Sequence, residues 1–342
     1  MRITQIVCTL GPACDNKTIL KKMNDAGMNI ARLNMSHGTH ETHQALIDKL
    51  STLRQKDKVK LMIDTKGPEI RIGNFKDGSA VLQTGKQFIL TSRNVQGDET
   101  QVSLIYKDLV KQVKAGNKIY ANNGLIVLNV TKVTPEDIIT TIEFGGTLSN
   151  HKSLNVPNVV PSGPYLSPAD KLDLNFAIKN QADYIALSFV SEAQNVKDVR
   201  KYLNARGGRN IKLIAKIENA KGVNNAEEIL DESDGLMVAR GDLGVEIPLQ
   251  KIPPVQKKLI SLCNAKRKLV IVATEMLESM TNSTRPTRAE VNDVANAIYE
   301  EANATMLSGE TSIGINPVLV VQTMGTIIDE IEKYVYNMKL DY

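Results

Sequence analysis

Two apolar runs that end in charged residues decide the fold: IKLIAKIE at residues 211–218 and DGLMVARGD at residues 234–242. Apolar residues occupy both faces of each run, as they do in strands that are buried on both sides of a parallel sheet. Lys216 and Glu218 close the first run, and Asp242 closes the second. Ionisable side chains at the ends of buried strands indicate a functional site at those ends.

Runs of the same kind recur along the chain, separated by stretches with helical periodicity. Six further runs lie at 4–10, 28–34, 59–64, 183–189, 268–276 and 304–311. Helix boundaries are marked by Gly27 after one stretch, by Ser167 and Pro168 before another, and by Thr287 with Glu290 before a third. Eight alternations of strand and helix predict an α/β fold, a (β/α)8 TIM barrel.

One interval of this barrel, residues 65–182, is too long for a single helical connection. Residues 70–157 within it show short alternating runs between Gly and Asn turns, which is all-β patterning. We therefore predict a small all-β lid domain at 70–157, inserted after the third strand, and a barrel formed by 1–69 and 158–342. An insertion at the carboxyl ends of barrel strands is well placed to cover a site.

The composition indicates a globular protein, and its mild positive charge is compatible with a site for an anionic substrate. The chain has 342 residues, 42% of them apolar and 23% charged, with a net charge of +4 and few aromatics, so nucleic acid is not an expected partner. No apolar run has membrane-spanning length and the N-terminus lacks a signal peptide, so we expect a cytoplasmic protein with no membrane partner. The three cysteines have no metal or disulfide spacing and are expected to be reduced thiols.

The carboxyl ends of the predicted strands are polar, and barrels of this kind place their active sites there. The side chains expected to face one cleft are Arg32, Asn34, Ser36, Asp64, Thr65, Lys216, Glu218, Asp242, Thr274 and Ser308. Side chains two apart on a strand share a face, so Lys216 should point with Glu218, and Arg32 with Asn34. The simpler alternative is that these charges form ordinary salt bridges at the barrel rim.

The chemistry of this set predicts two cation sites and an anionic substrate. Glu218 and Asp242 are hard oxygen ligands that suit Mg²⁺. Cationic side chains beside them imply a substrate that carries phosphate and carboxylate groups. The oxygen cluster that suits a monovalent cation comprises Asn34, Ser36, Asp64 and Thr65. We expect His37 at the surface or as a helix cap, and His40 and His43 in solvent.

Motifs spread over essentially the whole chain resemble the pyruvate kinase family. In order they are IVCTLGPA (6–13), MNIARLNMSHGTHETH (28–43), DTKGPEIR (64–71), IAKIEN (214–219), VARGDLGVEIP (238–248), ATEMLESM (273–280), RPTRAEVNDVANAI (285–298) and MLSGETSIG (306–314). The resemblance implies phosphoryl transfer from phosphoenolpyruvate to ADP, giving pyruvate and ATP, with Mg²⁺ (or Mn²⁺) and K⁺ as cofactors.

The resemblance also implies roles for individual residues. Lys216 would stabilise the transferring phosphoryl group and the developing enolate, and Arg32 would bind the phosphoryl group. The backbone at Gly241, with Asp242 and Thr274, would bind the substrate, and Thr274 lies near the proton delivery that yields pyruvate. The implied divalent ligands are Glu218 and Asp242. The implied K⁺ ligands are Asn34, Ser36, Asp64 and Thr65. The side chains implied to reach the nucleotide phosphates are Asn34, His37, Arg71 and Lys152.

Several features modify this expectation. Glu69 matches the K⁺-requiring members of the family, whereas a lysine there is similar to the K⁺-independent type. The turn at 122–124 reads NNG instead of the usual acidic DDG, which weakens any lid contact with rim arginines. The chain ends at Tyr342, so we expect the C-terminal effector domain and its effector site to be absent. The family's barrel-to-barrel contact predicts a homodimer.

Two alternatives to an active enzyme stay open. One is a catalytically weakened relative that binds or regulates, owing to the altered lid turn or to lost C-terminal contacts. The other is a different barrel that handles phosphoenolpyruvate or pyruvate, such as a metal-dependent aldolase. The second is disfavoured because DTKGPEIR and a lid insertion would have no role in it.

Overall fold

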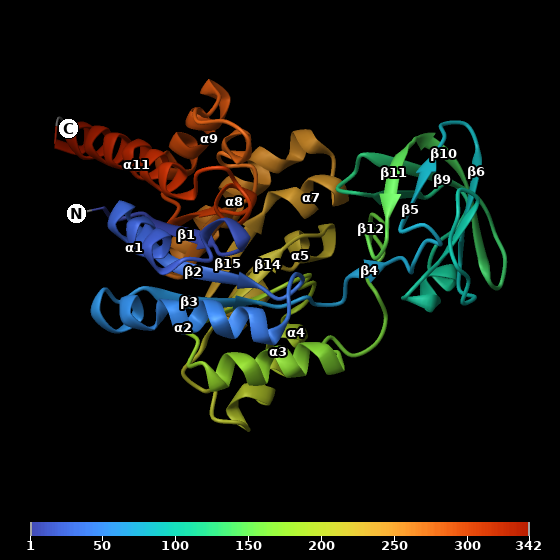
Figure 1. The fold of residues 1–342 in the computed structure, drawn as a ribbon, viewed down its shortest axis with the longest axis horizontal. Coiled ribbons are helices and arrows are strands. Elements are labelled where there is room, and N and C mark those ends of the chain that lie inside the picture. The colour runs from blue at the N-terminus through green and yellow to red at the C-terminus, as the bar shows by residue number, and fades with distance from the viewer. Residues whose placement is uncertain (1, 341–342) are drawn as a thin grey trace.

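The computed structural model describes residues 2–340, and within them eight parallel strands close into a barrel (Figure 1). The barrel strands are β1 (Gln5–Thr9), β2 (Met28–Asn34), β3 (Lys60–Asp64), β13 (Tyr184–Leu187), β14 (Lys212–Ile217), β15 (Gly235–Ala239), β16 (Leu269–Ala273) and β17 (Ala304–Leu307). Each lies within one of the predicted apolar runs. The TIM barrel predicted from the sequence is therefore confirmed.

Helices surround the barrel and follow its strands. They are α1 (Lys17–Ala26), α2 (His40–Lys56), α3 (Pro168–Lys179), α4 (Ala193–Asn204), α5 (Ala220–Asn224), α6 (Ala226–Glu232), α7 (Arg240–Glu246), α8 (Ile252–Ala265), α9 (Arg288–Tyr299), α10 (Gly309–Ser312) and α11 (Pro317–Leu340). Gly27 ends α1 in the left-handed conformation at φ +115°, and Ser167 and Thr287 cap α3 and α9 as predicted. None of the described helices is both long and apolar enough to cross a membrane.

The barrel interior is a separate apolar layer to which every barrel strand contributes. Its members include Val7, Ile30, Met62, Ala186, Ile214, Met237, Ile271 and Ala304. Alternate residues, such as Leu213 and Ala215 on β14, instead pack outward against the helices. Both faces of each strand are thus buried, which explains the continuous apolar runs in the sequence.

The insertion forms its own sheets, to one side of the barrel in Figure 1. Among the described residues, one sheet has the strand order β4 (Ile70–Arg71), β12 (Ser153–Asn155), β8 (Lys118–Ala121), β9 (Ile126–Val133), β10 (Asp137–Phe144), β6 (Gln87–Thr91) and β7 (Gln101–Ser103), and a smaller one pairs β11 (Gly146–Ser149) with β5 (Ser79–Leu82). A separate apolar core includes Phe88, Ile119 and Leu128. The all-β insertion is confirmed, while the domain boundaries at 69/70 and 157/158 stay a prediction.

Candidate active site

The alternation of side chains along the strands brings four polar residues together at the barrel mouth. Ile30, Met62, Ala186 and Ile214 belong to the interior layer. The residues two positions further along the chain therefore follow the same inward face. They are Arg32 on β2, Asp64 on β3, Ser188 just after β13 and Lys216 on β14. These strands are neighbours in the order β2, β3, β13 and β14, so the four side chains form one connected cluster.

A cavity of about 340 Å³ opens above this cluster. The predicted site residues that line it are Arg32, Asn34, Ser36, His37, Arg71, Lys152, Lys216, Glu218, Asp242, Thr274 and Ser308. Asp64 and Thr65 were expected to face the same cleft, but they lie behind its wall and are 0% and 2% exposed. Gly241 likewise contributes its backbone next to Thr274 without lining the cavity.

Lys216 is the buried cation at the centre of the cluster. Its Nζ lies 3.1 Å from Asp64 Oδ1, 2.7 Å from Ser188 Oγ and 3.0 Å from Glu218 Oε1. Burial alone would lower the pKa of Lys216, but the negative charges of Asp64 and Glu218 outweigh it and raise that pKa. Lys216 is therefore a fixed ammonium group at neutral pH.

Asp64 neutralises two cations from behind the cavity. Its Oδ2 accepts a 2.7 Å hydrogen bond from Arg32 Nε, while Oδ1 contacts Lys216. Burial would raise the pKa of Asp64, but Arg32 and Lys216 outweigh it and lower the pKa below its usual range. Arg32 also donates to Thr9 Oγ1 at 2.8 Å, so its guanidinium group is fixed from two sides.

Glu218 and Asp242 form a pair of carboxyl groups beside Lys216. Glu218 Oε2 accepts a 2.6 Å hydrogen bond from the Phe189 N–H. Burial raises the pKa of both groups, and the charge of Asp242 adds to the rise at Glu218. Two crowded acids whose negative charges oppose each other fit a divalent cation that keeps positions for substrate oxygens and water.

The position of Asp242 corrects one detail of the sequence interpretation. We expected the strand run at 235–242 to carry Asp242 at its end, but β15 stops at Ala239 and Asp242 lies in the first turn of α7. In the described part of the chain, no three His, Cys, Asp or Glu side chains are arranged to hold a metal ion by themselves. Any ion held by Glu218 and Asp242 would therefore need further ligands.

Thr274 lies on a strained loop after β16. It has φ +70° and Glu275 has φ +54°, values that are rare for residues other than glycine and especially for a β-branched one. Arg240 Nη2 donates to the Thr274 carbonyl at 2.6 Å, and Thr274 Oγ1 accepts a 2.7 Å hydrogen bond from the Gly241 N–H. Asp293 on α9 in turn accepts a 2.6 Å hydrogen bond from Arg240 Nη1.

A family model described as the barrel domain of pyruvate kinase matches residues 1–321. The chain belongs to the pyruvate kinase family. It is 42% identical over 97% of its length to a pyruvate kinase of Clostridium perfringens, 46% over 96% to one of Staphylococcus haemolyticus and 48% over 96% to one of Sporosarcina psychrophila. The chain spans 71% of the length of the first relative and 56% of the other two.

The residues that the pyruvate kinase resemblance assigns to the nucleotide lie at the outer edge of the cavity. Arg71 forms an ion pair with Glu69 at 2.5 Å and donates to the His151 carbonyl at 2.8 Å. His37 is exposed there, and partial desolvation followed by the charge of Arg71 lowers its pKa. Lys152 reaches the same edge from the inserted domain.

The cavity is also lined by residues that sequence reasoning did not place there, among them Lys66, Asn123, Ser153 and Ser188. Ser188 follows the interior residue Ala186 by two positions, so the strand alternation could have identified it. Asn123 belongs to the NNG turn, where Asn122 and Asn123 have φ +51° and +56°. Asparagine tolerates this left-handed conformation, so the turn forms without the acidic residues usual in the family.

Two histidines are not solvated as expected. His43 is 6% exposed, and its Nε2 lies 2.7 Å from the His37 carbonyl oxygen. His40 Nε2 lies 2.7 Å from Asp173 Oδ1, and its ring stacks on Phe176. His43 therefore supports the loop after β2, whereas His40 ties the start of α2 to α3.

The residues predicted to hold a monovalent cation are divided between the cavity and the layer behind it. Asn34 Oδ1 accepts a hydrogen bond from the Ser36 N–H at 3.1 Å, and both residues line the cavity. Behind them, the Thr65 hydroxyl donates to the Ala186 carbonyl at 3.3 Å. The oxygens lie on adjacent strands, since Asn34 pairs with Asp64 in the β2–β3 register.

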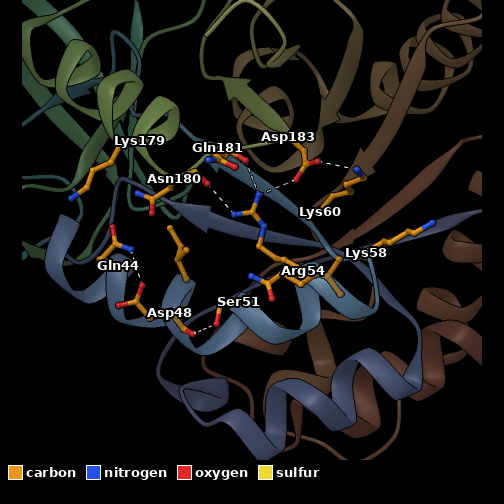
Figure 2. Close-up of a pocket in the computed structure, with 13 residues that line it drawn as sticks. Gln44, Asp48, Ser51, Arg54, Lys58, Lys60, Lys179, Asn180, Gln181 and Asp183 are labelled. Carbon is orange, nitrogen blue, oxygen red and sulfur yellow. Dashed lines mark hydrogen bonds and ion pairs between the residues drawn. The ribbon is translucent and has the colours of Figure 1, made fainter. Parts of the chain in front are cut away.

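A second hollow, of about 460 Å³, lies at the opposite end of the barrel (Figure 2). Arg54 of α2 donates there to the carbonyls of Asn180 and Gln181 at 2.9 and 2.6 Å. Arg54 and Lys60 both pair with Asp183, as the dashed lines in Figure 2 show. These charges tie α2 to the end of α3, a stabilising role that is usual at this face of a barrel.

Proposed function

We propose that this chain catalyses phosphoryl transfer from phosphoenolpyruvate to ADP, giving pyruvate and ATP, with Mg²⁺ (or Mn²⁺) and K⁺. The observation that carries the proposal is the buried Lys216 ammonium group, 3.0 Å from Glu218 at the mouth of the barrel. Phosphoryl transfer depends on positioning and charge neutralisation more than on covalent help from the protein. A fixed lysine, a fixed arginine and a two-carboxylate cation site supply both.

The donor set fits the proposed cations. Glu218 and Asp242 would hold the divalent ion, which when bound neutralises charge on substrate oxygens. The residues that would hold K⁺ are Asn34, Ser36, Asp64 and Thr65. Asp64 supplies the single formal charge of that set, and its lowered pKa keeps it ionised.

Arg32 and Lys216 would bind the transferring phosphoryl group from the barrel side. Lys216 would also stabilise the negative charge that develops on the enolate oxygen as the phosphoryl group leaves. The Gly241 N–H, which donates to Thr274 Oγ1 in the structure, would donate to the substrate carboxylate instead. Thr274 would then help deliver the proton that converts the enolate to pyruvate.

The outer edge of the cavity would bind the nucleotide phosphates. The side chains assigned to them are Asn34, His37, Arg71 and Lys152. Lys152 and Asn123 come from the inserted domain, so its closure would bring further polar groups over the bound nucleotide. A closed lid would exclude water and so limit transfer of the phosphoryl group to water.

We also propose a cytoplasmic location and a homodimer through the barrel domain. The first is supported by Cys8, Cys14 and Cys263, which are buried and free, as is usual in a reducing compartment. The second is supported by family membership alone, and light scattering of the purified chain tests it.

A coupled assay that follows pyruvate formation from phosphoenolpyruvate and ADP tests the proposed reaction. We expect turnover that requires a divalent cation and K⁺. Phosphoenolpyruvate binding without turnover would instead support a weakened binding or regulatory protein. Aldol cleavage products would indicate a different barrel enzyme.

A further inference from the structure

Each N–H donor of the Lys216 ammonium group has an acceptor in the structure. An ammonium group carries three N–H donors, and Lys216 has three acceptors within 3.1 Å: Asp64, Ser188 and Glu218. Two of these acceptors are carboxylates that pull the ammonium group in different directions. Asp64 lies behind the cavity, whereas Glu218 belongs to the proposed divalent site. The position of Lys216 between them therefore depends on the third, neutral partner.

Ser188 is rigidly held in that third place. Its hydroxyl donates to the Thr65 carbonyl at 2.6 Å, which leaves its oxygen lone pairs facing Lys216 Nζ at 2.7 Å. The Tyr165 hydroxyl donates to the Ser188 carbonyl at 2.6 Å. Gly67 packs so closely against Ser188 that a Cβ added there would lie 2.5 Å from the Ser188 carbonyl oxygen.

The residue after Ser188 contacts the other half of the ion pair. Phe189 has φ +56°, an unusual value for a bulky residue, and its N–H donates to Glu218 Oε2 at 2.6 Å. The segment Ser188–Phe189 thus contacts Lys216 through a side chain and Glu218 through the backbone. It fixes how far the lysine stands from the carboxylate.

We propose that Ser188 is a positioning residue that accepts one of the three N–H donors of Lys216 and so limits the hold of the ammonium group on Glu218, which it contacts at 3.0 Å. Glu218 can then serve a divalent cation while Lys216 serves the phosphoryl group. Without the Ser188 oxygen, the freed N–H donor turns to the neighbouring carboxylates, and the ammonium group binds Glu218 more tightly. A cation must then compete with Lys216 for the same carboxylate. This inference rests on the divalent site of the proposed function.

The test is a double-mutant cycle read by Mn²⁺ binding, measured by electron paramagnetic resonance without substrates. Ser188→Ala is expected to weaken Mn²⁺ binding by about tenfold, the scale of one hydrogen bond to a charged group. In a Lys216→Met background, where no ammonium group competes, the same substitution should change Mn²⁺ affinity by less than about twofold. Ser191→Ala is the matched control, because Ser191 is also 3% exposed but bonds Asn195 instead.

Thermal unfolding verifies that each variant is folded. A loss of Mn²⁺ affinity of equal size in both backgrounds would show a merely structural role and overturn the proposal. If Ser188→Ala caused no loss of Mn²⁺ affinity in the chain that retains Lys216, the proposal would be overturned as well. Absence of Mn²⁺ binding to the unaltered chain would overturn the divalent site of the proposed function together with this inference, whereas binding without coupling would overturn the role of Ser188 alone.

Discussion

Among single residues, Lys216 offers the clearest separation of catalysis from binding. Its ammonium group is buried and lines the cavity, and the proposed function assigns it to the charge that develops on the enolate oxygen. Lys216→Met keeps the length of the side chain and removes the charge. We expect kcat to fall by at least about a thousandfold, as when a main electrostatic contact of a transition state is lost. Equilibrium binding of phosphoenolpyruvate, measured by calorimetry, should change much less, and equal losses of both would instead mark ground-state binding.

Glu69 provides a second prediction at this scale, which concerns the monovalent cation. Its carboxylate pairs with Arg71 and lies within electrostatic range of Glu218 and Lys216. Glu69→Lys would replace a negative charge at the cavity with the positive charge that K⁺ otherwise supplies. We expect the variant to retain turnover without K⁺, measured in tetramethylammonium buffer. An unchanged K⁺ requirement would contradict the proposed monovalent site.

At the scale of elements, α9 holds the loop after β16 through a single arginine. Asp293 orients Arg240, and Arg240 in turn holds the carbonyl of the strained Thr274. Left-handed conformations of such residues persist only where their surroundings impose them. Asp293→Asn should therefore loosen Thr274 and lower kcat by about tenfold, the scale of one charge-assisted hydrogen bond.

Steady-state kinetics with Asp329→Asn as the control tests this role of α9. Asp329 also pairs with an arginine, Arg2, but its side chain is 57% exposed and lies on the surface. Exposed ion pairs of this kind contribute little to the free energy of unfolding. Equal kcat values for the two variants and the unaltered chain would show that Arg240 holds the loop without Asp293.

The contact between α7 and β12 predicts a pH-dependent stability. Glu246 of α7 faces Asn155 of β12, and burial raises its pKa from 4.5 to about 7 although the neighbouring Asn155 and Val156 groups oppose the rise. The folded state then binds this proton more tightly than the unfolded state does, so stability falls as pH rises from about 4.5 to about 7. Glu246→Gln should raise the unfolding temperature at pH 8 and have little effect near pH 4.5. A difference of the same size at both pH values would refute this origin.

Local signals in the sequence were sufficient for most elements. Capping residues such as Ser167 and Thr287 act within one turn, and the alternation along β14 correctly placed Lys216 beside Glu218. The helical start at Arg240 was missed because the apolar run before it does not show where strand pairing with β16 stops. Local patterns thus locate an element better than they locate its last residue.

Features that depend on packing between elements were beyond local reasoning. Asp64 lies behind the cavity, where the Arg32 side chain bonds it from β2 although the β2–β3 register pairs Asp64 with Asn34. His43 is buried because α2 packs against the loop that carries His37. Ser188 differs from these two residues, because the strand alternation could have identified it; it was overlooked as a single neutral hydroxyl in an apolar run.

At the scale of the whole molecule, the barrel and the insertion would together transfer a phosphoryl group between two bound substrates. Phosphorus NMR of the purified chain with phosphoenolpyruvate, ADP, Mg²⁺ and K⁺ follows that group directly. We predict that the phosphoenolpyruvate resonance is replaced by the γ-phosphate resonance of ATP, and that the Lys216→Met variant leaves both substrates unchanged. Release of inorganic phosphate in place of ATP, or no reaction by the unaltered chain, would contradict the account.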